Sequence, residues 1–180
     1  MVKVGRDRGA YVGGRNMEIN MIEINDQIIE AITAHAERDY PHECGGMLIG
    51  KFEDGKKTVV ETFPLENARD EADRNDRILI LPKDVLRAER YAREKKLDVV
   101  GYYHSHPDDT AIPSQYDLDH ALPVWSYVIA SVINGKVEDL RSWEMENDRS
   151  RFNSELIVRA VGQQANSYHF TFSGDRILCP

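Results

Sequence analysis

The chain has few cysteines, few basic residues and no long apolar run. Its two cysteines, Cys44 and Cys179, are too few for a disulfide scaffold and indicate a reducing compartment. The longest mostly apolar run, 124–133, is much shorter than the ~20 residues that a membrane-spanning helix needs. The basic first residues lack the apolar stretch of a secretory signal. We therefore expect a cytoplasmic protein without a membrane segment.

The scarcity of positive charge limits the classes of partner. Lys and Arg number 23 against 31 Asp and Glu, which gives a net charge of −8. General nucleic-acid binding depends on a basic surface, so this balance argues against nucleic acid as a partner. Hydrophobic residues make up 41% and charged residues 30% of the 180 positions, which is typical of one folded domain with its own core.

The chain is predicted to form one domain, residues 17–180, after a flexible leader at residues 1–16. Asn25 is a favourable N-cap for an amphipathic helix that Pro41 ends. Ser114 is the expected N-cap of a later, short helix. Apolar periodicity and turn residues predict another helix at 83–96 and strands at 17–24, 46–52, 58–63, 77–81, 97–104, 125–133, 137–143, 156–161 and 168–172.

Turn signals join several of these strands as hairpins. Asp54-Gly55 and Asn134-Gly135 are both tight-turn pairs between strand-like segments. The polar segment 67–76 is predicted to be a loop, which is either solvated or faces a substrate. Because hairpins are mixed with helical connections, we expect a mixed sheet and a fold of the α/β or α+β class.

The segment 101–117 carries the residues with the clearest chemical meaning. His104 and His106 are two positions apart, so on a continuous strand both imidazoles point to the same face, about 6.5 Å apart at Cα. Asp117 falls in the first turn of the helix that Ser114 caps. Two imidazoles and one carboxylate leave a fourth tetrahedral position for water, as in a catalytic zinc site. Singly, each residue has a structural explanation, such as a capping-box acid; their combination favours a metal.

Together with Glu43, these residues resemble the signature of the JAMM (MPN+) metalloprotease family, in particular its short prokaryotic members. The signature has a Glu, then His-Ser/Thr-His, seven residues, Ser, two residues and Asp. In this chain the matching positions are Glu43, His104-Ser105-His106, 107–113, Ser114 and Asp117. The resemblance covers about residues 19–143. It implies a single JAMM/MPN-like domain with a mixed, mostly antiparallel curved sheet flanked by about three helices.

The resemblance also implies a role for each matched residue. His104, His106 and Asp117 are expected to bind one Zn²⁺ per chain. Glu43 is expected to be the general base that takes a proton from the attacking water and passes it to the leaving amine. Ser114 is expected to donate a hydrogen bond to the oxyanion.

The implied activity is hydrolysis of the amide or isopeptide bond after the Gly-Gly C-terminus of a ubiquitin-like or sulfur-carrier protein. The alternative is a catalytically silent MPN-type scaffold that binds a ubiquitin-like partner, although the complete ligand set argues against it. A DNA-repair-associated relative does not suit the charge of −8. A zinc deaminase would need His-x-Glu and Pro-Cys-x-x-Cys, which do not occur. Iron or copper is compatible with the ligand types, but two His and one Asp favour zinc.

The remaining histidines and the first cysteine receive structural interpretations. Cys44 is expected to be a buried structural thiol, and Ser105 is expected to point away from the two histidines that flank it. His42 is expected to be exposed. The other histidines have no ligand-like partner at a useful spacing: His35, His120 and His169.

Overall fold

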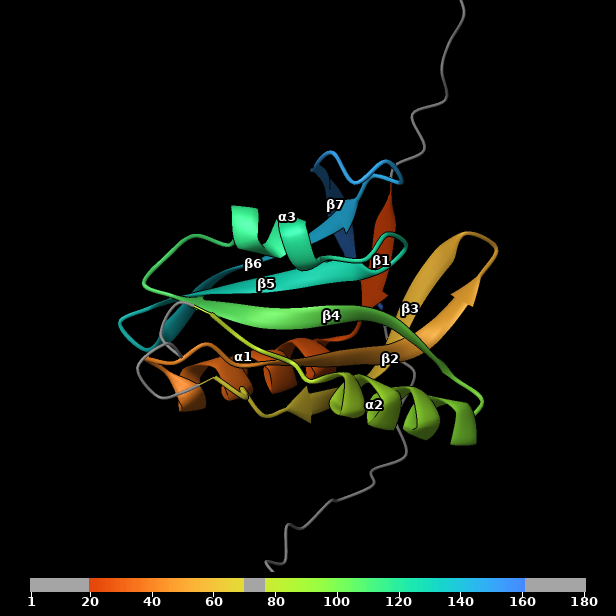
Figure 1. Cartoon of the computed structure of the whole chain (residues 1–180), viewed down its shortest axis with the longest axis horizontal. Helices are drawn as coiled ribbons and strands as arrows, with labels where there is room; N and C mark the ends of the chain where they lie inside the picture. The colour runs from red at the N-terminus through yellow and green to blue at the C-terminus, as the bar shows by residue number, and fades with distance from the viewer. Residues whose placement is uncertain (1–19, 70–76, 161–180) are drawn as a thin grey trace, which may run out of the picture.

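The computed structural model describes residues 20–69 and 77–160 (Figure 1). The expected leader, the expected strand at 168–172, His169 and Cys179 lie outside these ranges. Within them, no helix combines the length and apolar character needed to cross a membrane. The elements are β1 (Met21–Ile24), α1 (Asp26–Asp39), β2 (Gly45–Glu53), β3 (Lys56–Leu65), α2 (Pro82–Glu94), β4 (Asp98–Pro107), α3 (Gln115–His120), β5 (Ser126–Ile133), β6 (Lys136–Met145) and β7 (Phe152–Arg159).

The seven described strands form one closed sheet in the order β1-β3-β2-β4-β5-β6-β7. β1 runs parallel to both β3 and β7, and β4 runs parallel to β5, whereas the other pairings are antiparallel. The predicted mixed α+β fold with three helices is confirmed. The expected curved sheet needs a correction, because the sheet is closed: Ile22 of β1 pairs with both Lys57 and Ile157, and these two pairings close it.

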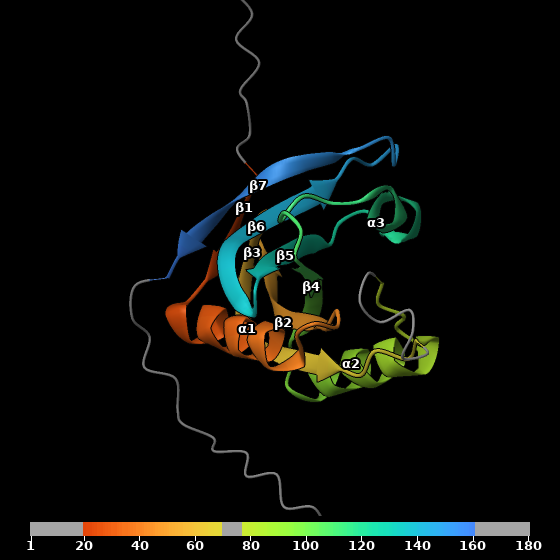
Figure 2. The ribbon, with the colours of Figure 1, turned by 90° about the vertical axis from the view of Figure 1, so that its left-hand side faces the viewer.

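Helices α1 and α2 lie on either side of β2 (Figure 2). α1 begins where Asn25 Oδ1 accepts a hydrogen bond from the Ile28 backbone N–H at 2.9 Å. Its apolar side chains share a core with Leu48 of β2, whereas Met47 and Ile49 pack on the other face with α2. This alternation follows the period of two of a strand with both faces buried. The buried apolar residues of the two helices are Ile28, Ile32, Ala36, Ala88 and Ala92.

The expected strand at 77–81 is wrong. Residues 77–81 form no strand. Instead, the Leu79 backbone N–H donates to Asn67 Oδ1 at 3.1 Å, and the Leu79 carbonyl accepts from the Ala68 N–H at 3.0 Å. Local apolar character predicted a strand, but the backbone partners come from a loop.

Strand β4 places two sets of side chains on opposite faces. It lies between β2, with Gly45 opposite His104, and β5, with which it runs parallel. His104 and His106 face one side. The intervening Ser105 faces the other, where its hydroxyl accepts from the Cys44 N–H at 3.0 Å. The predicted orientation of Ser105 is confirmed.

Candidate metal centre

Three side chains converge at the end of β4. Nε2 of His104 lies 3.0 Å from Nε2 of His106. The Asp117 carboxylate reaches both, with Oδ1 3.1 Å from His104 Nε2 and Oδ2 3.6 Å from His106 Nε2. The ligand atoms of these three residues all lie within 4.8 Å of one another. The grouping expected from the spacing therefore exists in the fold.

The three side chains are electrostatically coupled. Burial lowers the pKa of His104, so this imidazole is held neutral. Burial acts in the same direction on His106, but its hydrogen bond to Asp117, its bond to Thr110 and the nearby carboxylates raise its pKa overall. Burial opposes ionisation of Asp117, yet hydrogen bonds from the two histidines hold its pKa far below the usual range. The carboxylate is thus ionised next to two nitrogen ligands.

The donor set fits a zinc ion. His106 Nδ1 lies 2.8 Å from the Thr110 carbonyl oxygen, which can only accept, so Nδ1 carries a proton and Nε2 is the nitrogen that would bind a metal. Such a second hydrogen bond orients most metal-binding histidines. His104 Nδ1 is buried without a hydrogen-bond partner in the described residues, and its ring stacks on Tyr102 with centroids 5.3 Å apart. Two imidazoles and one carboxylate are the donors of an open catalytic zinc site.

Asp117 also caps the helix that carries it. The backbone N–H and the hydroxyl of Ser114 donate to Asp117 Oδ2 at 2.7 and 2.6 Å, and the Asp117 N–H donates to Ser114 Oγ at 3.2 Å. The N-cap predicted at Ser114 is confirmed as a capping box. The structural and the metal-binding interpretations of Asp117 are therefore compatible, because Oδ1 lies beside His104 while Oδ2 accepts from Ser114.

Glu43 is buried at the start of β2, with 8% of its surface exposed. Extending the β2–β4 register from Gly45 opposite His104 places Glu43 opposite His106, and directly opposed residues project to the same face. The Glu43 backbone carbonyl accepts from Asn67 Nδ2 at 3.0 Å. Glu43 and Asn67 also border a surface groove of about 650 Å³. The predicted base thus lies beside the predicted ligands and next to an open groove.

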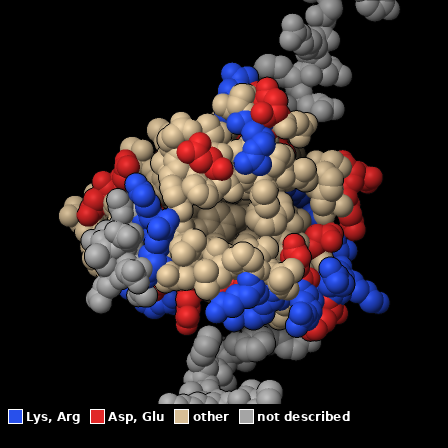
Figure 3. Space-filling view, in the orientation of Figure 1, with Lys and Arg blue, Asp and Glu red and all other residues tan. Residues whose placement is uncertain are grey.

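An apolar cavity of about 280 Å³ adjoins the metal centre, with Asp117 on its wall. It opens on the face seen in Figure 3, where tan side chains surround a central hollow. One wall comes from residues 78–80 and the other from α3 and the residues after it. The lining side chains include Met47, Tyr102, Tyr116, Leu122, Trp125 and Tyr127.

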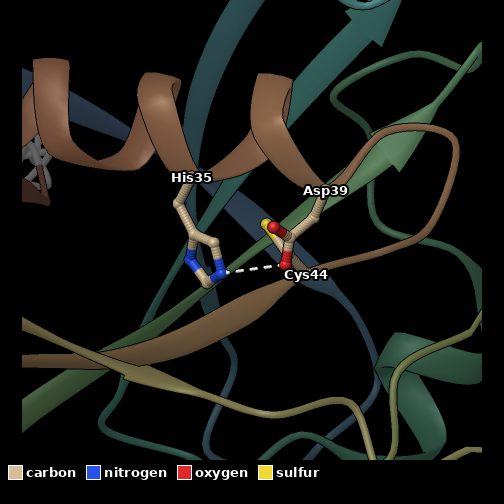
Figure 4. A group of neighbouring side chains, drawn as sticks. All are labelled: His35, Asp39 and Cys44. Carbon is tan, nitrogen blue, oxygen red and sulfur yellow. Dashed lines mark ion pairs between the residues drawn. The ribbon is translucent and has the colours of Figure 1, made fainter. Parts of the chain in front are cut away.

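A second cluster lies behind β4 and corrects the prediction for His35. Its Nε2 lies 3.2 Å from Asp39 Oδ2, one helical turn along α1, and Cys44 completes the group (Figure 4). His35 Nδ1 is 2.8 Å from the Tyr103 hydroxyl. Burial raises the pKa of the Cys44 thiol to about 12, which agrees with an unreactive structural thiol. The signal for this cluster was present in the i,i+4 spacing of His35 and Asp39.

Three other residues depart from or extend the predictions. His42 is half-buried rather than exposed. His120 stacks on Tyr116 with ring centroids 4.0 Å apart, on the rim of the cavity. Asn67 was predicted only as part of a polar loop, although an Asn just after an apolar strand is a recognised backbone-binding residue.

The chain belongs to the prokaryotic JAB family. A family model described as prokaryotic homologs of the JAB domain matches residues 25–146. This span contains all the residues of the JAMM-type signature: Glu43, His104, His106, Ser114 and Asp117.

Relatives of the chain carry different names. It is 33% identical over 108 residues to the tail tip assembly protein K of Escherichia phage N15, covering 58% of this chain and 40% of that protein. It therefore spans less than half of that relative. It is 29% identical over 133 residues to the CysO-cysteine peptidase of Mycobacterium tuberculosis, covering 73% of this chain and 87% of the peptidase. It is 28% identical over 110 residues to the desampylase of Haloferax volcanii, covering 61% and 76%.

Solved structures share the fold over most of the chain. A solution structure of a Desulfitobacterium hafniense protein matches with a TM-score of 0.70 and 25% identity, covering 83% of this chain and all of that one. A solution structure of a Salinibacter ruber protein matches with a TM-score of 0.61 and 35% identity, covering 84% and 99%. The matched part of the chain therefore has the same fold as these two structures.

Proposed function

We propose that the protein is a zinc-dependent peptidase or isopeptidase that cleaves the amide bond after the Gly-Gly C-terminus of a ubiquitin-like or sulfur-carrier protein. The observation that carries this proposal is the convergence of His104, His106 and Asp117 beside the buried Glu43. The names of two relatives, CysO-cysteine peptidase and desampylase, support the choice of substrate class.

His104, His106 and Asp117 would hold one Zn²⁺. When bound, zinc polarises the scissile carbonyl and lowers the pKa of water to ~7. Glu43 accepts a proton from the attacking water and then donates it to the leaving amine.

Ser114 is proposed to stabilise the oxyanion. Its hydroxyl proton is directed at Asp117 Oδ2, at 2.6 Å, so the hydroxyl must rotate to donate to the substrate. Asp117 stays in place during that rotation because the Ser114 backbone N–H also holds Oδ2, at 2.7 Å. The hydrogen bond from the backbone N–H therefore holds Asp117 in place, while the hydroxyl turns to donate to the oxyanion.

The diglycine tail is proposed to lie along residues 77–80. The tail cannot add beside β2 at the site, because β2 is paired on both sides and has no free edge there. Leu79 uses both of its backbone groups on the 67–68 loop. The direction of backbone groups alternates along an extended segment. We propose that the backbone groups of Ile78 and Ile80 therefore face the cavity, where a slim tail can add as a strand.

The test combines metal content with cleavage. We expect about one zinc per chain and chelator-sensitive cleavage of a ubiquitin-like protein carrying a C-terminal extension after Gly-Gly. Glu43→Gln should keep the metal and lose turnover, whereas His104→Ala should lose both. Asp98→Asn, an exposed change at the far end of β4, is the control and should change neither.

Each outcome of this test has a defined meaning. Full turnover by Glu43→Gln would remove Glu43 from the mechanism. Binding of the carrier without cleavage, by a protein that contains zinc, would favour the silent scaffold. Absence of zinc from the folded protein would overturn the metal centre itself.

A further inference from the structure

Two arginines converge on one aromatic ring at the edge of the candidate active site. The guanidinium carbon of Arg69 lies 5.7 Å from the centroid of the Tyr116 ring, and that of Arg77 lies 5.3 Å from it. Arg69 Nη2 also donates to the Tyr116 hydroxyl at 2.7 Å. Two basic side chains therefore lie against one ring, in a chain whose net charge is −8.

One side chain fixes the backbone of both arginines. Asn67 Oδ1 accepts from the Arg69 backbone N–H at 3.1 Å, and Asn67 Nδ2 donates to the Arg77 carbonyl at 2.9 Å. The same Nδ2 donates to the Glu43 carbonyl at 3.0 Å, and the same Oδ1 accepts from the Leu79 N–H. All four hydrogen-bonding positions of the amide are used. Asn67 thus connects the backbone of both arginines to the backbone of Glu43, the proposed base.

The Tyr116 ring, which both arginines approach, belongs to the wall of the proposed active site. Tyr116 immediately precedes the metal ligand Asp117, and both line the apolar cavity. His120 also stacks on this ring, with centroids 4.0 Å apart. Both guanidinium groups therefore lie against a residue of the cavity wall.

We propose that Arg69 and Arg77 form a subsite for a carboxylate group of the substrate. This inference rests on the proposed function, and it specifies that the substrate group recognised here is negatively charged. Guanidinium groups bind carboxylates through paired, charge-assisted hydrogen bonds. An acidic protein surface repels a carboxylate, so a local arginine pair is what allows one to approach this cleft.

The carboxylate can belong to either side of the scissile bond. It can be an acidic side chain in the tail before Gly-Gly, or the free carboxylate of an amino acid joined to the tail. Two matched pairs of substrates separate these sources. In the first pair, the leaving group is the same and the tail carries either Glu or Gln before Gly-Gly. In the second pair, the tail is the same and it carries either an amino acid with a free carboxylate or the carboxamide of that amino acid. We expect one pair to differ by about tenfold or more in kcat/KM, with the carboxylate preferred.

Variants assign the preference to the arginines. Arg77 is exposed, so Arg77→Gln should fold normally and reduce the preference, and Arg77→Glu should reverse it toward a substrate with Lys in place of Glu. Asn67→Ala should weaken the preference without removing a charge. Arg141→Gln is the matched control, because Arg141 pairs with Asp139 on β6 and is likewise exposed.

Binding keeps this inference separate from the proposed function. Calorimetry with uncleaved tail peptides and the Glu43→Gln protein measures the same carboxylate preference without turnover. A preference in binding that Arg77→Glu reverses would support the subsite even if no substrate were cleaved. Equal affinity and equal kcat/KM for both members of both pairs, or a preference that survives Arg77→Glu, would overturn it.

Discussion

At the residue scale, single groups in this site have two partners each. Asp117 offers one carboxylate oxygen to His104 and the other to Ser114. Asn67 connects Glu43 with both ends of the 70–76 segment. Substitutions at such residues therefore change local structure and chemistry together, and a test must measure both.

Ser114 gives the clearest prediction at this scale. Ser114→Ala removes the side-chain cap of α3 and should cost about 1 kcal/mol of unfolding free energy. It also removes the proposed oxyanion donor, so kcat should fall by ~10²–10³. Thermal unfolding and steady-state kinetics measure the two effects.

Ser114→Thr is the matched control because it keeps a hydroxyl that can cap and donate. It should retain most of the stability and much of the activity. A Ser114→Ala protein with normal kcat and reduced stability would leave Ser114 as a helix cap alone.

At the element scale, the strand that carries His104 and His106 depends on close approach to its neighbour. A Cβ added to Gly101 of β4 would lie 2.4 Å from the Ser126 carbonyl oxygen of β5, which is backbone and cannot move aside. We expect Gly101→Ala to lower the unfolding free energy by about 3 kcal/mol and to weaken metal binding, because His104 lies three residues along the same strand.

Gly55 supplies the comparison, since it lies in a turn with φ of +77° and open space around its Cβ. Gly55→Ala should cost only about 1 kcal/mol, from the left-handed backbone, and leave metal binding unchanged. Urea unfolding and metal titration of both variants check this. Equal costs for the two changes would contradict the close-packing explanation.

The sequence predicted the elements that local signals determine. Asn25 and Ser114 cap helices as expected, and Asp54-Gly55 turns a hairpin. The grouping of His104, His106 and Asp117 was predictable because a strand period and a helix cap bring these residues together. The closure of the sheet by β1 was not, since parallel pairing partners lie far away in sequence. Asn67 was missed because its partners become neighbours only after folding.

At the scale of the whole molecule, a buried polar network crosses the closed sheet. Lys57 Nζ lies 3.0 Å from Glu144 and 3.4 Å from Glu155. Glu155 accepts from the hydroxyls of Ser126 and Ser142 at 2.9 and 2.6 Å. These residues come from β3, β5, β6 and β7, so the network joins strands on both sides of β1.

Removing the cation from this network should be costly. Lys57→Met would leave a buried Glu155 without its opposite charge, and we expect a loss of about 3–5 kcal/mol of unfolding free energy. Lys136→Met breaks an exposed pair with Glu37 and should cost no more than ~1 kcal/mol. Chemical denaturation of both variants measures the difference, and similar costs would show that the buried network is not a main contributor.

The capping box of α3 has a consequence for ligand binding. A helix of six residues is far too short to persist alone in water, so the turn 115–120 exists because Ser114 and Asp117 hold its first turn. The carboxylate that closes this box is the one that faces both histidines. Ordering of the turn and occupation of the centre are therefore thermodynamically linked, and each strengthens the other. Amide hydrogen exchange in this one turn should report the state of the entire site.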